Sequence, residues 1–86
     1  MKPTAAEVER VLLTLADGRG IDKTFCPSEA ARRLSPNNWR EQMPKVSATA
    51  IRLVNEDKLR CTQRGNEVDP ATARGPLRFS LPKPEC

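Results

Sequence analysis

Basic and hydrogen-bonding side chains recur along one flank of residues 44–57 and continue into the residues that follow. Guanidinium and ammonium groups bind phosphate oxygens, while threonine and asparagine side chains can bond to the edges of base pairs. This is the chemistry that a surface for double-stranded DNA requires. The candidate DNA-contacting residues are Lys45, Thr49, Arg52, Asn55, Arg60, Arg64, Arg74 and Arg78.

Catalytic and metal-binding chemistry has little support in the sequence. The chain has no histidine for general base catalysis at neutral pH, no Gly-x-Ser-x-Gly motif and no glycine-rich phosphate loop. Cys26, Cys61 and Cys86 lie far apart without a Cys-x-x-Cys pair, so we expect reduced thiols, no metal and no cofactor. Cys26 precedes a proline at an expected helix start, where a helix cap is a simpler role than a reactive thiol. We therefore expect a protein that is not an enzyme.

The distribution of charge is uneven along the chain. The net charge of +4 arises from 15 Lys and Arg against 11 Asp and Glu, and eight basic and five acidic residues follow position 43. This excess favours an acidic partner without requiring one, and ordinary solvated charges are the simplest alternative. Aromatic residues amount to 3%, which argues against stacking on single-stranded bases.

The first helix is predicted by apolar residues at helical spacing after Thr4. Thr4 and Glu7 fit a capping box, and the Asp and Gly at residues 17–18 are expected to end the helix. In the connection that follows, Ile21 and Phe25 are predicted to point inward.

A second helix is expected to begin at Pro27, which suits the first helical position, and to run to about Leu34. Its small apolar face should let another helix approach closely. Glu29 lies near the positive end of the helix dipole and is expected to pair with Arg33 one turn later.

Residues 37–43 predict one or two separate helical turns that bring Trp39 onto the core, and Pro44 is expected to break the backbone after them. A third, longer helix is predicted over residues 44–57, with its candidate DNA-contacting side chains opposite an apolar stripe. That stripe consists of Val46, Ala50, Leu53 and Val54.

Two segments of alternating character, residues 59–64 and 77–81, predict strands with one buried face that pair as an antiparallel hairpin. The Gly and Asn at residues 65–66 should turn the chain, and Val68 could add a brief strand within the long loop. Residues 82–86 contain two prolines and are expected to form a flexible tail.

This order of elements, mainly helical with a small hairpin, is that of a winged helix-turn-helix, with a three-helix core and a C-terminal antiparallel wing. A chain of 86 residues can bury one core and not two. We therefore predict a single winged-helix domain over residues 1–81.

Several short motifs also carry a family resemblance. They are Cys26-Pro27-Ser28-Glu29-Ala30-Ala31-Arg32, Trp39-Arg40, Met43-Pro44, Thr62-Gln63-Arg64-Gly65, Val68-Asp69-Pro70 and Arg74-Gly75-Pro76-Leu77-Arg78. In this order, over nearly the whole chain, they resemble the bacterial domain-of-unknown-function 3253 family. The resemblance implies a winged-helix fold and no established activity. Ser47 stands where the relatives commonly have arginine, and Asp57 where they usually have glycine; the first difference weakens the case for nucleic-acid contact by this helix.

In a winged helix, the helix over residues 44–57 would enter the major groove, and the loop over 65–75 would touch the backbone or the minor groove. A DNA-binding protein, such as a transcriptional regulator, is the expectation that follows. The alternative is a protein-interaction module that binds through the same helix or wing, or through the sheet edge at residues 77–81. Monomer and homodimer both stay open.

The polar start of the chain does not fit a signal peptide, and no apolar run approaches the roughly 20 residues of a membrane helix. We therefore expect a cytoplasmic protein that has no membrane partner.

Overall fold

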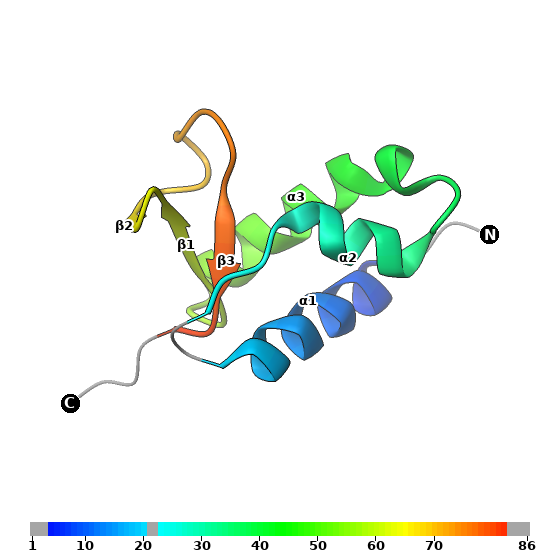
Figure 1. Ribbon diagram of the computed structural model, residues 1–86, viewed down its shortest axis with the longest axis horizontal. Coiled ribbons are helices and arrows are strands. Elements are labelled where there is room, and N and C mark those ends of the chain that lie inside the picture. Colours follow the sequence, from blue (N-terminus) through cyan, green and yellow to red (C-terminus); the bar gives the residue numbers. More distant parts are fainter. Residues whose placement is uncertain (1–3, 21–22, 83–86) are drawn as a thin grey trace.

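Residues 4–20 and 23–82 are described by the computed structural model, and within them three helices precede a three-stranded antiparallel sheet (Figure 1). The helices lie against one another, and the sheet with its long loop rises beside one end of them. The elements are α1 (Ala5–Arg19), α2 (Pro27–Leu34), α3 (Trp39–Asn55), β1 (Arg60–Gln63), β2 (Asn66–Glu67) and β3 (Arg78–Ser80). This layout confirms the predicted three-helix core with a C-terminal wing.

Helix α1 begins where the capping box predicts and ends later than expected. The Thr4 hydroxyl accepts a hydrogen bond from the Glu7 backbone N–H at 3.2 Å. Gly18 lies inside the helix, whereas Gly20 follows its last residue with φ of +84°. Because glycine enters this left-handed region without a steric penalty, Gly20 and not Gly18 ends the helix.

Helix α2 has the predicted bounds, but its acidic residue pairs differently. Glu29 accepts a hydrogen bond from the Cys26 backbone N–H at 2.8 Å and forms an ion pair with Arg19 of α1. The predicted pair with Arg33 is wrong, because a carboxylate that turns back to cap its own helix points away from the next turn. The Arg19 guanidinium also donates a hydrogen bond to the Glu29 carboxylate, and this bond holds the pKa of Glu29 below its ordinary value.

Helix α3 is continuous, so the predicted break at Pro44 is wrong. The helix starts at Trp39 and runs through Pro44, which is exposed. Proline has no N–H to donate to the carbonyl of Arg40, and a proline inside a helix costs about 3 kcal/mol. Because the side of α3 opposite Pro44 is buried along most of its length, packing there outweighs the missing hydrogen bond.

The two predicted strands pair as antiparallel neighbours, and Cys61 lies opposite Phe79. A brief additional strand, β2, pairs with the other edge of β1, but it covers Asn66–Glu67 and not Val68, whose N–H donates to the Cys61 carbonyl at 3.1 Å. The turn comes one residue earlier than predicted, at residues 64–65, with φ of +53° and +83°. Positive φ at both positions is typical of a type I′ hairpin turn.

The prediction that the sheet buries only one face is wrong. Thr62 and Ser80, which alternate with Cys61 and Phe79, are buried as well. Arg60 explains part of this burial, because its Nε donates a hydrogen bond to the Ser80 hydroxyl at 3.3 Å and a long side chain shields the surface beneath it.

Phe25 joins the helices to the sheet. Its backbone N–H donates to the carbonyl of Phe79 at 2.8 Å, and the Phe79 N–H donates to the Phe25 carbonyl at 2.9 Å. The two rings are buried with centroids 6.2 Å apart. The inward position predicted for Phe25 is confirmed, and this pairing occupies the sheet edge of β3 at Phe79.

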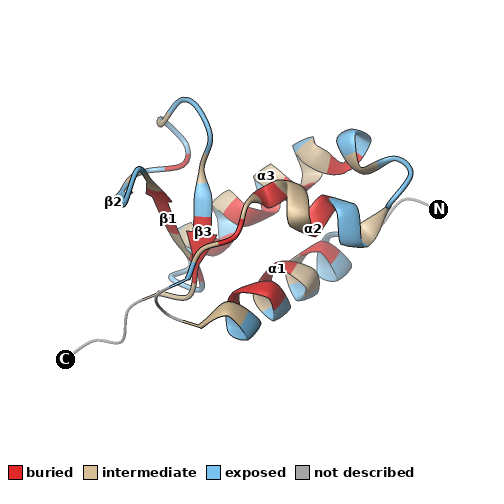
Figure 2. Cartoon of the chain, viewed as in Figure 1, coloured by how far each residue is buried: buried red, intermediate tan, exposed pale blue. Residues whose placement is uncertain are grey.

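The core lies between the helices and the base of the sheet, where the buried faces turn toward one another (Figure 2). Ala30 and Ala31 form the small face of α2 that packs against α3, as expected, whereas Val54 of the predicted stripe is only half-buried. Burial raises the pKa of the Cys61 thiol to about 11. The buried apolar residues are Val8, Leu12, Leu15, Ala16, Phe25, Ala30, Ala31, Val46, Ala50, Leu53, Leu59, Cys61 and Phe79.

The predicted boundary between domain and tail falls at Pro82, which is half-buried and is the last residue described. Two predictions lie outside the described residues: the remainder of the tail, residues 83–86, and the inward position of Ile21. Among the helices in the described part of the chain, none is long and apolar enough to cross a membrane.

The first prediction concerns the contact between Phe25 and Phe79. Phe79→Ala removes a ring that is 1% exposed, and loss of a buried phenylalanine typically costs about 3 to 5 kcal/mol of unfolding free energy. Urea denaturation followed by circular dichroism measures this loss. Leu77→Ala, at a half-buried position two residues away, should cost clearly less. Equal losses for the two variants would contradict a central role for the Phe79 ring.

The second prediction concerns pH. Because the folded pKa of Glu29 lies below its ordinary value of 4.5, its contribution to stability is present above that value and is lost as the pH falls through the folded pKa. Glu29→Gln should therefore unfold more easily at neutral pH by up to about 1 kcal/mol, since water screens so exposed a pair. When the pH is lowered, the variant should also lose less unfolding free energy than the wild type does. Glu67→Gln, at an exposed strand position, is the control, and identical pH profiles for wild type and Glu29→Gln would refute the assignment.

Candidate nucleic-acid interface

The candidate residues on α3 do not share one exposed flank. Thr49 is 6% exposed and lies on the same helical side as Val46 and Leu53, so its predicted position opposite the apolar stripe is wrong. The spacing explains the error: Thr49 lies three residues after Val46 and four before Leu53, and residues so spaced lie on the same side of a helix. Asn55 is exposed and can meet a ligand.

Arg52 is engaged by two carboxylates. Its Nη2 lies 2.7 Å from Glu9 Oε1 of α1, and its Nη1 lies 2.8 Å from Glu56 Oε2. These hydrogen bonds raise the pKa of Arg52 and lower that of Glu56, which also contacts Lys58 at 3.3 Å. A phosphate would therefore have to replace carboxylates that already hold this guanidinium.

Lys45 also has acidic surroundings. It is half-buried and borders a hollow that Glu41 lines as well. The basic candidates of α3 thus lie beside carboxylates, and the middle of its outer face is uncharged, with Ala48 exposed and Ile51 half-buried. Neighbouring carboxylates therefore offset the charge of Lys45 and Arg52, where the sequence suggested a basic flank.

The wing brings three of the candidate arginines together. Arg64 in the turn, Arg74 in the loop and Arg78 in β3 line one open pocket of about 740 Å³, here called the wing pocket. Cys26 at the start of α2 lines it from the helical side. Among the described residues that form its lining there is no Asp or Glu, and the carboxylate with which Arg78 interacts electrostatically, Glu29, lies outside this lining.

Backbone contacts fix the loop that carries Arg74. The Gln63 side chain donates hydrogen bonds to the carbonyl of Arg74 and, at 3.4 Å, to that of Pro76. Gly75 between them has φ of +94°, and a Cβ built there would lie 3.1 Å from the Gln63 Nε2. A residue with a side chain would be strained at this position, so glycine permits the closed loop.

Arg78 is oriented by the segment before α2. Its Nε donates to the Thr24 hydroxyl at 2.6 Å, and its Nη2 donates to the Thr24 carbonyl at 3.1 Å. Since a guanidinium has five N–H donors, these two contacts leave donors for a ligand.

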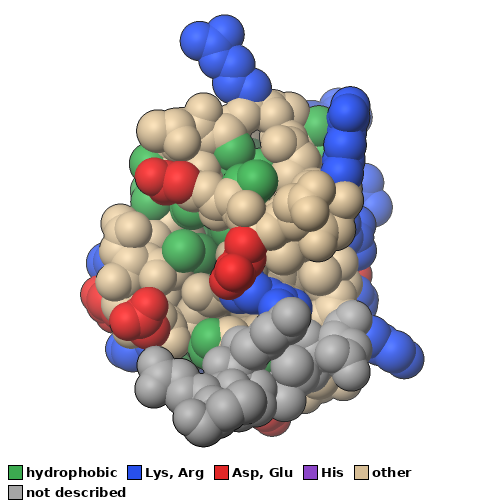
Figure 3. Space-filling view, turned by 90° about the vertical axis from the view of Figure 1, so that its left-hand side faces the viewer, with side chains coloured by type: hydrophobic (Ala, Val, Ile, Leu, Met, Phe, Trp, Pro, Cys, Tyr) green, Lys and Arg blue, Asp and Glu red, His purple; other side chains and the backbone are tan. Residues whose placement is uncertain are grey.

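Arg60 lies apart from the other wing arginines. It lines a smaller pocket of about 280 Å³ together with Asp57, Glu67 and Asp69. Figure 3 views this end of the molecule, where Lys and Arg side chains project at the top and the right-hand margin, while the Asp and Glu side chains of the centre and left lie beside further Lys and Arg side chains. The acidic residues of the wing thus line the pocket of Arg60 and not the wing pocket.

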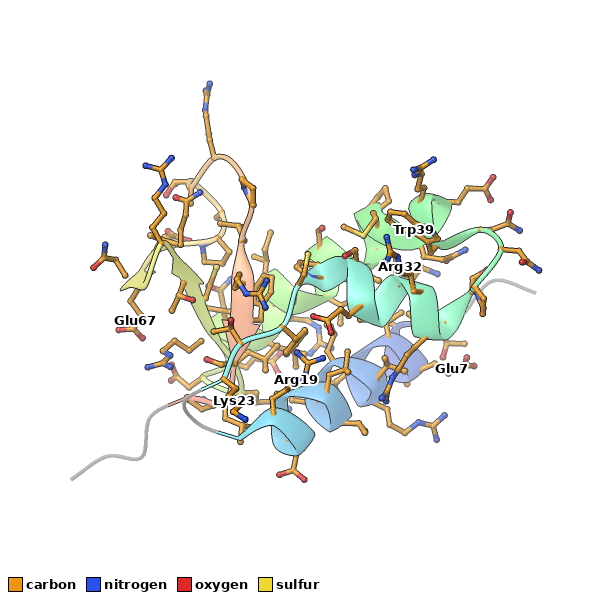
Figure 4. All side chains as sticks on the ribbon, in the orientation of Figure 1. Glu7, Arg19, Lys23, Arg32, Trp39 and Glu67 are labelled. Carbon is orange, nitrogen blue, oxygen red and sulfur yellow. The ribbon has the colours of Figure 1, made fainter. Side chains whose placement is uncertain are left out.

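The structure also brings together residues that the sequence did not single out as a pair. Arg32 of α2 lies over the Trp39 ring at 4.5 Å from its centroid, and Arg40 lies at 5.1 Å (Figure 4). Trp39 is half-buried, and its ring attracts cations placed over its face. Only the seven-residue separation of Arg32 and Trp39 across a turn hints at the contact, and such a spacing is not specific.

Three helices followed by an antiparallel hairpin, with a basic pocket beside the hairpin, define a winged helix-turn-helix protein. The chain belongs to the family of proteins of unknown function DUF3253, whose family model matches residues 5–82. This confirms the resemblance drawn from the sequence motifs. A comparison with curated proteins finds no match.

Proposed function

We propose that this protein is a cytoplasmic winged-helix protein that binds double-stranded DNA, as a transcriptional regulator does, and that the wing makes its main phosphate contacts. The observation that carries the proposal is the grouping of Arg64, Arg74 and Arg78 around one pocket whose described lining has no acidic residue. Guanidinium groups bind phosphate oxygens through paired, charge-assisted hydrogen bonds.

In this proposal α3 approaches the major groove with its uncharged outer face. Ala48 and Ile51 would contact thymine methyl groups, and Asn55 is the side chain able to hydrogen-bond a base edge. Arg52 would contribute less than the wing, because Glu9 and Glu56 already bind it. We therefore expect affinity to come from the wing and weak sequence preference to come from α3.

A protein-interaction module is the second candidate, and the outer face of α3 supports it. Pro44 and Ala48 are exposed there and Ile51 is half-buried, so an apolar partner could pack on this helix. The sheet edge of β3 supports it less, because Phe25 occupies the backbone groups of Phe79.

The third prediction tests duplex binding by its dependence on salt. If three wing arginines each contact one phosphate, the affinity for a generic duplex should fall roughly 40-fold between about 50 and 200 mM salt. Fluorescence anisotropy with a labelled duplex measures this slope. Binding that is undetectable even at low salt would reject the proposal and favour the protein-interaction module.

A double variant assigns the contacts to residues. Arg64→Ala with Arg74→Ala should reduce the remaining salt effect to roughly three- to fourfold over the same range, since one contact would remain. Arg10→Ala, an exposed position on α1, is the control for loss of a charge and should keep the wild-type slope. An unchanged slope in the double variant would exclude these arginines as phosphate contacts.

A further inference from the structure

We infer that the wing pocket also binds a small aromatic anion, a carboxylate or phosphate carried on a ring, and that this ligand competes with DNA for the pocket arginines. Binding of such an anion in the pocket does not depend on DNA binding, whereas the competition rests on the proposed function. The inference combines the charge, the rigidity and the apolar walls of one site.

The charge of the pocket favours an anion. Arg64, Arg74 and Arg78 line it, and its described lining has no carboxylate to neutralise them. The nearest acidic group of the neighbouring helix, Glu29, is turned toward Arg19 and the Cys26 backbone N–H. An incoming carboxylate or phosphate therefore meets guanidinium groups without displacing an acidic side chain of the lining.

The Arg78 side chain and the backbone that carries the other two arginines are held in place before a ligand arrives. Arg78 is fixed by its two hydrogen bonds to Thr24, and the backbone of Arg74 is fixed by Gln63. Arg64 is held at the hairpin turn by its backbone conformation. Because Arg78 and the backbone beneath the other two arginines are already ordered, a small ligand loses less of its binding energy to ordering the site.

Besides the arginines and the polar Gln63 and Asn66, the pocket has apolar walls, and a DNA phosphate makes no use of these. Val68, Pro76 and Leu77 line the pocket between the arginines. A volume of about 740 Å³ lies within the usual range for small-molecule sites, which place a few polar groups in a mostly apolar lining. Guanidinium planes also stack on aromatic rings, so one ring can contact both kinds of wall.

Cys26 provides a position-specific test of occupancy. It is half-buried and lines the pocket, while Cys61 is 1% exposed. In a Cys86→Ser background, N-ethylmaleimide should therefore modify Cys26 first. Phenyl phosphate is the probe, and at about ten times its Kd it should slow this alkylation about tenfold. Inorganic phosphate has the anionic group without a ring, and benzyl alcohol has the ring without a charge. Each should therefore protect Cys26 much less at the same concentration.

Variants then separate the two kinds of wall. Arg64→Ala with Arg74→Ala should abolish protection by phenyl phosphate, while Arg10→Ala should leave it unchanged. Leu77→Ala should weaken the protection by phenyl phosphate and leave any effect of inorganic phosphate as it was. Unliganded alkylation rates equal to those of the Cys86→Ser parent show that each variant keeps its pocket.

Several results would overturn the inference. Protection that does not saturate, that inorganic phosphate matches, or that persists in the double arginine variant would exclude the aromatic-anion site. The competition is tested by adding phenyl phosphate to the duplex assay, where it should raise the apparent Kd for DNA. Saturable protection with unchanged DNA affinity would overturn the competition. If the chain binds no duplex, the proposed function fails, and Cys26 protection alone decides on the pocket.

Discussion

The paired backbone hydrogen bonds between Phe25 and Phe79 are the contact on which the arrangement of this domain depends. They attach the segment that leads into α2 directly to β3, and the two buried rings fill the space beneath. Thr24 and Cys26 flank Phe25, which places the residue that orients Arg78 and the start of α2 beside the wing. The wing pocket is thus built from segments far apart in the sequence, and it exists because this short pairing closes.

Electrostatics divides the surface differently from what a count of basic residues suggests. Each charged candidate on α3 lies beside a carboxylate, most clearly Arg52 between Glu9 and Glu56. In the wing, the chain turns so that acidic residues gather around Arg60 while the other arginines face a pocket without them. An arginine that is paired with a carboxylate is less able to bind another anion. The location of the acidic residues therefore decides which basic residues can do so.

Local rules predicted most of the elements, and tertiary contacts decided the rest. The Thr4 cap, the start of α2 and the β1–β3 pairing follow from capping, proline and alternation signals that act over a few residues. The continuity of α3 does not, because the packing of its buried side overrides the local effect of Pro44. The candidate site was predicted less well. The burial of Thr49 follows from its spacing between Val46 and Leu53, whereas the pairing of Arg52 with Glu9 depends on where α1 lies, which no pattern within α3 records.

Pro44 has a consequence for how α3 can deform. The carbonyl of Arg40 receives no N–H from position 44, so the first part of the helix is joined to the rest by one main-chain hydrogen bond fewer. Helices bend most easily where this ladder is interrupted. If α3 curves to follow a bound surface, the bend should therefore fall at residues 40–44, and the segment around Leu53, which is anchored in the core, should stay straight.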